Sequence, residues 1–385
     1  MRIFLSAGEA SGDMYGAGLM QALREELRQS GRAQDAEFFG VGGEAMRAAG
    51  CDLVVNAHEI AVVGLAEVVR HLPRIYGLFN KTVREVERRR PDVAVLIDFP
   101  DFNLRLARRL HRRGIPVVYY VSPQLWAWRS SRVESIRKYV RKMLVIFPFE
   151  TKFYAEHGVD AQFVGHPLAD VAPSVIARDE FAHSYGLDTS RTWIALLPGS
   201  RQGEVSRIFP TLLEAAQLLG PDYVYIVPVA STLNEAWMRD FLPPDPKIDV
   251  VLTSDAPATL AHARAAAVAS GTSTLQAALI GTPFVMVYRV AELSWKFGRP
   301  LVKVHRFAMP NLIAERDIVP ELVQENLDPA RVASEVRRLL PESNERSAMI
   351  RAFEDVRHRL TADANHLPAS RQAAQAILSD MGRRA

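Results

Sequence analysis

Residues 93–103 read Val-Ala-Val-Leu-Ile-Asp-Phe-Pro-Asp-Phe-Asn, a short apolar run that ends in an acid and passes into a helical pattern. The run Val93–Asp98 has the length and the β-branched content of a buried strand. Pro100, two residues after this run, breaks the extended pattern before a helical segment that begins near Phe102. A strand followed at once by a helix is the repeating unit of a parallel α/β sheet, so this stretch predicts that fold class.

The same unit recurs in two series along the chain. Strands are predicted at Arg2–Ser6, Glu37–Val41, Val93–Asp98, Val117–Val121, Met143–Ile146, Ala161–Val164, Trp193–Leu197, Tyr223–Val229, Asp249–Leu252, Ala267–Ala269 and Pro283–Tyr288. The segment Gly165-His166-Pro167-Leu168 interrupts the alternation. We therefore predict two Rossmann-like, doubly wound domains facing a cleft, at 1–167 and 168–345. C-terminal helices at 346–385 are expected to pack back on the first domain or on a partner subunit.

The composition of the 385 residues is that of an ordinary globular protein, with 48% hydrophobic and 24% charged residues. The single cysteine, Cys51, excludes an internal disulfide and a cysteine-rich zinc site, and it fits a reducing cytoplasm. The apolar run at the start is too short for a signal peptide. No later run approaches the ~18–20 apolar residues of a membrane-spanning helix, so we expect no membrane span.

Positive charge is concentrated in one part of the chain. The formal net charge is only +3, but the segment from Arg70 to Lys142 holds 18 Lys and Arg against 6 Asp and Glu. Such a segment attracts phosphates of anionic lipid or nucleic acid, unless its arginines form the solvated faces of helices. Aromatic residues do not interleave with the basic ones as stacking platforms would, which argues against nucleic acid.

An apolar stripe lies within Gly64–Asn80. Its members recur at helical spacing: Leu65, Val68, Val69, Leu72, Ile75, Tyr76 and Phe79. Basic residues interleave with them, and Pro73 is expected to end or kink the helix. The stripe is either a face that packs on the core or an interfacial helix that binds acyl chains.

Two acidic motifs follow predicted strands in the first domain. Residues 6–13 read Ser-Ala-Gly-Glu-Ala-Ser-Gly-Asp, where glycines and a helix N-terminus suit an anionic ligand, although a plain turn with Asp13 as N-cap is the alternative. Asp98 ends a strand where ligands bind in open α/β sheets, and burial there would make it a general base. The alternative role for Asp98 is an N-cap, which Asp101 can supply instead.

Two motifs of the second domain suit phosphate. Residues 196–204 read Leu-Leu-Pro-Gly-Ser-Arg-Gln-Gly-Glu, in which Arg201 offers a planar fork to phosphate oxygens. Residues 269–276 read Ala-Ser-Gly-Thr-Ser-Thr-Leu-Gln and place small hydroxylated residues at a helix N-terminus. Two such anion-binding loops in one domain suit a nucleoside diphosphate.

Several kinds of site have no signal in the sequence. There is no Asp-x-Asp pattern for a metal-bound nucleotide sugar and no His, Asp and Glu set at metal-ligand spacing. A Gly-x-Ser-x-Gly elbow and a Cys–His nucleophile are also missing. We therefore expect neither a metal nor a cofactor.

Long motifs of this chain resemble those of the lipid-A-disaccharide synthase family of bacterial glycosyltransferases. In chain order they are SAGEASGD (6–13), LIDFPDFN (96–103), YYVSPQLWAW (119–128), FPFE (147–150), VGHPL (164–168), LLPGSR (196–201), ASGTSTL (269–275) and MPNLI (309–313). These motifs occur in order across nearly the whole chain. The resemblance implies a GT-B-type fold, an acceptor- and lipid-binding first domain and a UDP-sugar-binding second domain.

The resemblance also implies an inverting transfer. It would join UDP-2,3-diacylglucosamine to 2,3-diacylglucosamine 1-phosphate (lipid X), giving lipid A disaccharide 1-phosphate and UDP. Asp98 would be the base for the acceptor 6-hydroxyl. The UDP site would comprise Gly199, Ser200, Arg201, Ser270, Gly271, Thr272, Gln276, Asn311 and Glu315. Contacts to the acceptor or to lipid are expected at Ser11, Asp13, Val68, Val69, Leu72, Ile75 and Tyr76.

One position departs from the pattern of the family. Gln276 stands where related sequences usually carry glutamate, at a place suited to ribose hydroxyls. Glutamine keeps a hydrogen-bond acceptor and loses the charge.

We expect a peripheral protein on the cytoplasmic face of the inner membrane. A homodimer is possible, but the sequence does not decide the oligomeric state. The rival functions are a UDP-sugar epimerase on the same architecture and a nucleotide-sugar-binding protein without turnover.

Overall fold

The computed structural model describes residues 1–31, 36–61, 68–127, 130–170, 176–242, 247–299, 305–362 and 367–382. For residues 61, 68–72, 130, 293, 297 and 298 it describes the backbone alone. The chain forms two compact units, and each is described by itself. Unit 1 comprises Met1–Asp170 and Leu360–Ala385, and unit 2 comprises Val171–Arg359.

In its described residues, unit 1 holds a seven-stranded parallel sheet with the order β3-β2-β1-β4-β5-β6-β7. The strands are β1 (Arg2–Ala7), β2 (Glu37–Gly42), β3 (Asp52–Asn56), β4 (Val93–Ile97), β5 (Val117–Tyr120), β6 (Lys142–Val145) and β7 (Ala161–Phe163). β1 and β4 are apolar and buried along nearly their whole length, because helices cover both faces of the sheet. The strand order reverses between β1 and β4. That reversal is the point at which open α/β sheets bind ligands.

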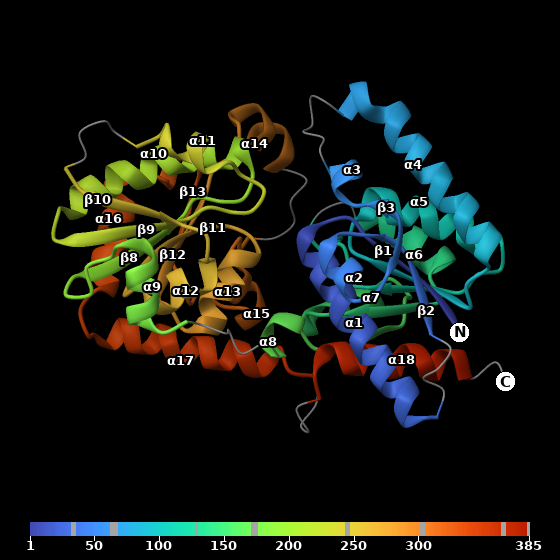
Figure 1. Cartoon of the computed structure of the whole chain (residues 1–385). Helices are drawn as coiled ribbons and strands as arrows, with labels where there is room; N and C mark the ends of the chain where they lie inside the picture. Colours follow the sequence, from blue (N-terminus) through green and yellow to red (C-terminus); the bar gives the residue numbers. More distant parts are fainter. Residues whose placement is uncertain are drawn as a thin grey trace. The chain divides into compact units, whose positions relative to one another are not determined.

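Helices flank this sheet on both faces (Figure 1). They are α1 (Ala10–Gln29), α2 (Glu44–Ala48), α3 (His58–Ala61), α4 (Val68–Arg89), α5 (Pro100–His111), α6 (Val133–Tyr139), α7 (Pro148–Glu156), α8 (Pro167–Asp170) and α18 (Ala369–Gly382). α4, α5 and α6 contact one another in sequence, while α1 contacts α2 and α18. No helix in the described residues combines the length and the apolar character needed to cross a membrane.

Unit 2 repeats the architecture with a six-stranded parallel sheet in its described residues, ordered β10-β9-β8-β11-β12-β13. The strands are β8 (Thr192–Leu197), β9 (Tyr223–Pro228), β10 (Asp249–Thr253), β11 (Ala265–Ala269), β12 (Phe284–Tyr288) and β13 (Glu321–Val323). The helices are α9 (Arg178–Tyr185), α10 (Gln202–Leu219), α11 (Glu235–Arg239), α12 (Ala256–His262), α13 (Thr272–Ile280), α14 (Glu292–Gly298), α15 (Met309–Ala314), α16 (Pro329–Leu339) and α17 (Asn344–Arg359).

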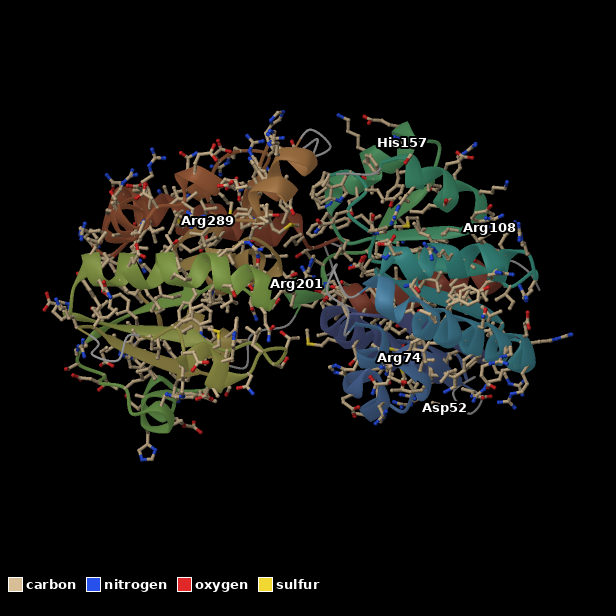
Figure 2. The ribbon with its side chains drawn as sticks, turned by 90° about the horizontal axis from the view of Figure 1, so that it is seen from above. Asp52, Arg74, Arg108, His157, Arg201 and Arg289 are labelled. Atoms are coloured by element: carbon tan, nitrogen blue, oxygen red, sulfur yellow. The ribbon has the colours of Figure 1, made fainter. Side chains whose placement is uncertain are left out.

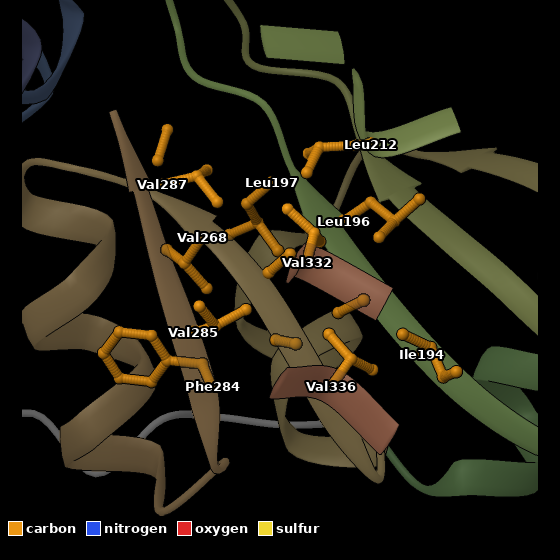
Figure 3. Packing of buried hydrophobic residues seen from close by; sticks show 14 of the residues in the cluster. Ile194, Leu196, Leu197, Leu212, Val268, Phe284, Val285, Val287, Val332 and Val336 are labelled. Carbon is orange, nitrogen blue, oxygen red and sulfur yellow. The ribbon is translucent and has the colours of Figure 1, made fainter. Parts of the chain in front are cut away.

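The core of unit 2 forms where helices pack on the central strands. Ile194 and Leu196 of β8 and Val268 of β11 lie beside Val332 and Val336 of α16 (Figure 3). All five side chains are buried. Aliphatic residues in both layers therefore fix the two central strands, whose carboxyl ends carry the two phosphate motifs.

The C-terminal helices divide between the units. α17 contacts α13 and α15 of unit 2, whereas α18 packs along α1 of unit 1. Arg371 of α18 forms an ion pair with Glu26 of α1 at 2.5 Å. Asp380, also in α18, forms an ion pair with Arg141 at 2.8 Å. The last helix thus belongs to the N-terminal unit although the chain has passed through the other unit in between.

Two strands were not predicted, and one of the two alternatives for Pro73 is excluded. β3 and β13 were not predicted, because these edge strands are only five and three residues long and are defined by their pairing with β2 and β12. Pro73 does not end its helix, since α4 runs through it to Arg89. One missing backbone N–H is offset by the burial of Phe79 and Val86 further along the same helix.

Candidate functional site

Asp98 follows β4 at the reversal point of the sheet in unit 1. Asp98 and Phe99 have φ angles of 45° and 49°, in the left-handed region that non-glycine residues rarely adopt. The Asp98 N–H donates to the Tyr120 carbonyl at 3.2 Å, and its carbonyl accepts from the Tyr119 hydroxyl at 2.6 Å. Two consecutive residues of this kind cost on the order of 1–3 kcal/mol each and persist where the surroundings impose them.

Asn103, at the end of the same motif, fixes this turn from α5. Its side chain is fully buried, and its Nδ2 donates to the carbonyls of Asp98 at 2.9 Å and of Ser6 at 3.2 Å. Its Oδ1 accepts from the Ser6 hydroxyl at 2.7 Å. One amide therefore joins the ends of β1 and β4. Asn103 lies in a quoted motif, but nothing in the local sequence pattern predicted this role.

The environment of the Asp98 carboxyl suits proton transfer near neutral pH. Burial, together with the negative charge of Glu9, raises the pKa of Asp98 to about 7, while the Phe99 N–H acts in the opposite direction. Glu9 lies in the β1–α1 loop, whose Gly8 has no room for a side chain, since a Cβ would come within 2.3 Å of the Phe99 ring. The two predicted acidic motifs thus meet at one edge of the sheet.

Asp13 has a structural role in this chain. Its carboxylate is buried and accepts three backbone N–H groups, from Gly43 at 2.6 Å, Ala45 at 2.9 Å and Met46 at 3.1 Å. It therefore caps α2, which lies thirty residues away, rather than the helix that contains it. Three of the roughly four acceptor positions of the carboxylate are thus used within the protein, and the expected acceptor contact at Asp13 stays a prediction. Ser11 is half-buried in the first turn of α1.

Glu150 joins two further motifs in the interior of unit 1. Its side chain is 0% exposed, and it accepts from the indole N–H of Trp126 at 3.1 Å and from the Phe147 N–H at 3.1 Å. Burial raises the pKa of Glu150 to about 8, although these hydrogen bonds favour the charged form. The contact ties the segment after β5 to the start of α7.

The phosphate motifs of unit 2 lie side by side. Gly199–Arg201 follows β8 and Ser270–Thr272 follows β11, and these parallel strands are neighbours. Arg201 is exposed at the N-terminus of α10 (Figure 2). Gly271 is exposed at the N-terminus of α13 with a φ of 136°. The edge therefore presents a guanidinium and two helix N-termini, a combination that suits a diphosphate.

Glu204 supports the first loop, a role that was not predicted from the sequence. Its Oε2 accepts from the Ser200 N–H at 3.2 Å. A Cβ on Gly199, whose φ is 122°, would come within 2.2 Å of that oxygen. Burial raises the pKa of Glu204, and the charge of Arg201 lowers it. The carboxylate thus occupies the space that a side chain at position 199 would need.

The remaining predicted UDP residues lie in different settings. Ser270 donates its hydroxyl to the Phe307 carbonyl at 2.9 Å, Thr272 is exposed, and Gln276 is half-buried in α13. Glu315 is exposed at the end of α15 with a φ of 56°.

Asn311, a predicted UDP contact, is 1% exposed. Its Oδ1 accepts from the N–H groups of Ile318 and Val319, and its Nδ2 donates to the Val319 carbonyl and to Glu321. All four of its hydrogen-bonding positions are used within the protein, so it fixes the loop after α15, and its contact with UDP stays a prediction.

The apolar stripe is described only in its C-terminal part. The side chains of Val68, Val69 and Leu72 lie outside the described residues. Ile75 packs partly against the core, whereas Tyr76 is 60% exposed. Arg74 is exposed on the same helix, and Figure 2 labels it. Core packing and surface exposure therefore alternate along this part of α4. Among the described residues, no cluster of His, Cys, Asp or Glu has the geometry of a metal site.

Two solved structures share the fold at low sequence identity. The calicheamicin glycosyltransferase CalG4 matches with a TM-score of 0.58 at 19% identity, over 100% of this chain and 99% of that chain. The UDP-GlcNAc 2-epimerase from Neisseria meningitidis, bound to UDP-GlcNAc, matches with a TM-score of 0.66 at 10% identity, over 100% of both chains. A transferase and an epimerase thus share one GT-B-like fold, which by itself does not separate the two reactions.

Sequence relatives separate them. The family model for lipid-A-disaccharide synthetase matches residues 3–377. The lipid-A-disaccharide synthase of Koribacter versatilis (strain Ellin345) is 56% identical over 382 residues, which cover 98% of this chain and 98% of that protein. This chain therefore belongs to the lipid-A-disaccharide synthase family and is a glycosyltransferase of lipid A biosynthesis.

Proposed function

We propose that the enzyme transfers the 2,3-diacylglucosamine unit of its UDP derivative to the 6-hydroxyl of 2,3-diacylglucosamine 1-phosphate. Unit 1 binds the acceptor, and unit 2 binds the UDP-sugar. The observation that carries this division is the position of Asp98. It stands at the reversal point of the first sheet with a pKa of about 7, while the loops suited to a diphosphate lie on the second sheet.

In the proposed reaction Asp98 accepts the proton of the acceptor hydroxyl. The oxygen attacks the anomeric carbon from the face opposite UDP, which inverts the configuration. The bond between that carbon and the β-phosphate oxygen breaks, and UDP leaves with the bonding electrons. Arg201 and the N-termini of α10 and α13 stabilise the negative charge that develops on the diphosphate.

The proposed UDP contacts follow from the two loops. Gly199, Gly271 and Thr272 offer backbone N–H groups or a hydroxyl, and Ser200 and Ser270 line the same edge. Gln276 and Glu315 remain proposed contacts to the rest of the nucleotide. Asn311 and Glu204 position the protein around these loops, because their own polar atoms are engaged.

Product analysis tests the proposed function. The purified enzyme is mixed with UDP-2,3-diacylglucosamine and 2,3-diacylglucosamine 1-phosphate, and the products are analysed by mass spectrometry. We expect a disaccharide phosphate and one UDP for each disaccharide formed. An epimer of the donor, or UDP release that does not depend on the acceptor, would overturn the assignment.

The pH dependence of kcat/KM should follow the ionisation of Asp98. The carboxylate is the active form, so we expect kcat/KM to fall about tenfold per pH unit below pH 7. Glu9→Gln removes a negative charge that raises this pKa, so the acidic limb should move to lower pH. An acidic limb that is the same in the wild type and in Glu9→Gln would contradict the assignment of Asp98 as the base.

The substrates also favour a membrane-surface location on the cytoplasmic side. Each CH₂ that leaves an apolar phase for water costs about 0.8 kcal/mol, so diacyl sugars stay in the bilayer. We propose that the stripe on α4, with Val68, Val69, Leu72, Ile75 and Tyr76, contacts acyl chains or the bilayer surface. Tyr76 is its described exposed member, and basic neighbours such as Arg74 add about 1 kcal/mol each at an anionic surface.

Vesicle binding tests this proposal. Tyr76→Ser should weaken flotation with vesicles of phosphatidylglycerol and phosphatidylethanolamine while leaving the melting temperature unchanged. Leu218→Ser is the matched control, because Leu218 is 53% exposed in unit 2 and lies outside the stripe. Equal vesicle binding by the wild type and both variants would speak against the membrane role of Tyr76.

A further inference from the structure

Unit 2 contains a cavity of about 420 Å³ at the edge of its sheet where the strands begin. Thr192 and Trp193 line it at the start of β8, and Arg264 lines it just before β11. The proposed diphosphate loops follow the opposite ends of these two strands. The six residues of β8 separate the two places by roughly 20 Å at 3.3 Å per residue. The volume lies within the range of about 300–1,000 Å³ that is usual for small-molecule sites.

Positive charge dominates the lining of this cavity. No acid lines it in the described part of unit 2, while four arginines do: Arg178, Arg191, Arg264 and Arg346. Arg191 pairs with Asp249 at 2.9 Å, and Arg264 pairs with Glu342 at 2.7 Å. For the other two arginines, the described residues provide no ion pair. Asp179 acts on Arg178 and Glu342 acts on Arg346 only from beyond ion-pair distance.

Arg178, at the start of α9, is held in place by uncharged groups. Its guanidinium lies over the Trp193 ring at 3.6 Å from the centroid, and its Nη1 donates to the His262 carbonyl at 2.8 Å. Burial lowers the pKa of Arg178, and the charge of the neighbouring Asp179 acts in the opposite direction. Stacking fixes the plane of the fork without neutralising it.

Arg346, in α17, is more deeply buried, at 8% exposed. Its Nη1 donates to the carbonyls of Arg264 at 2.7 Å and of Leu339 at 2.8 Å. Burial, and next the charge of Arg264, lower the pKa of Arg346, while the charge of Glu342 acts in the opposite direction. Carbonyl oxygens satisfy individual donors but do not supply the negative charge that a buried guanidinium usually has beside it.

We propose that this cavity binds a soluble phosphate-bearing anion, in addition to the UDP site. Two guanidinium groups that form no ion pair in the described residues match a phosphate group, which carries a charge of about −1.5 to −2 at neutral pH. The planar forks of Arg178 and Arg346 suit its oxygens. The bound anion would join three segments that are distant in sequence, the start of α9, the start of β11 and the start of α17.

Crossed binding measurements test the site. Inorganic pyrophosphate is titrated by calorimetry into the full chain saturated with UDP, so that the proposed donor site is occupied, and UDP is titrated separately, at an ionic strength kept constant with chloride. Arg178→Gln should weaken pyrophosphate binding at this cavity by tenfold or more and leave UDP affinity unchanged. Arg201→Ala should weaken UDP binding and leave the cavity intact. Failure of the proposed donor site and failure of the cavity therefore give different results.

Two controls keep the result interpretable. Arg239→Gln removes an exposed arginine of α11 that pairs with Glu235, so it makes the same change of charge away from the cavity. Arg178→Lys keeps the charge but loses the fork, so it should bind pyrophosphate more weakly than the wild type. It carries the test if Arg178→Gln does not fold. Unchanged pyrophosphate affinity in the folded Arg178 variants would overturn the proposal and leave these arginines as structural clamps.

A second arm separates a soluble anion from a lipid headgroup. Binding to phosphatidylcholine vesicles that contain phosphatidic acid should be the same for the wild type and Arg178→Gln. A loss of vesicle binding in Arg178→Gln, together with unchanged pyrophosphate affinity, would overturn the assignment to a soluble anion.

Discussion

Replacing Asp98 by asparagine is expected to lower kcat by about 10²- to 10⁴-fold, the usual contribution of a general base. Asparagine keeps the shape of the side chain but cannot accept the proton. The contacts of the Asp98 backbone come from Tyr119, Tyr120 and Asn103, and in Asp98→Asn the side-chain oxygen of the new amide can still accept from the Phe99 N–H. The fold should therefore persist, and steady-state kinetics with both substrates measures the loss.

Stability provides an internal control for Asp98→Asn. The pKa of Asp98 in the folded protein is raised, so in the wild type the buried carboxylate costs stability above pH 7, and this cost disappears below the ordinary aspartate pKa. The variant lacks that cost. Its melting temperature relative to the wild type should therefore be higher at pH 8 than at pH 4. A variant with near-normal kcat would show that another group takes the proton.

Replacing Arg201 by alanine is expected to weaken UDP binding by about 10- to 100-fold. A hydrogen bond to a charged group contributes roughly 1.5–3 kcal/mol, and 1.4 kcal/mol corresponds to tenfold in affinity. Arg201 is exposed at the start of α10, so its removal should leave the core unchanged. Calorimetric titration with UDP measures the effect.

Arg207→Ala is the matched control for Arg201→Ala. Arg207 is another exposed arginine of α10, and its guanidinium donates to the carbonyl of Gly203 in its own helix. We expect it to bind UDP as the wild type does. Equal UDP affinity in Arg201→Ala and Arg207→Ala would remove Arg201 from the proposed donor site.

Several features of the site depend on hydrogen bonds between residues that are far apart in the sequence, and local sequence patterns do not predict such contacts. Asp13 caps a helix through Gly43, and Asn103 joins the ends of two strands through Ser6. Asn311 carries its hydrogen bonds to residues that follow a turn. In each case the polar side chain looks available in the sequence, and the tertiary contact shows that it is occupied. The cavity arginines belong to the same class, because four separate segments bring them together.

The sequence by itself determined the α/β class, most of the strands, the positions of Asp98 and of the two phosphate motifs at strand ends, and the family. These features depend on apolar periodicity and on turn residues within a few positions, which neighbouring residues encode. Only the tertiary structure decided the pKa of Asp98, the capping role of Asp13, the buried network of Asn311 and the edge strands β3 and β13. Desolvation, hydrogen-bond satisfaction and strand pairing depend on which distant segments exclude water from a group, and that information is not local in the chain.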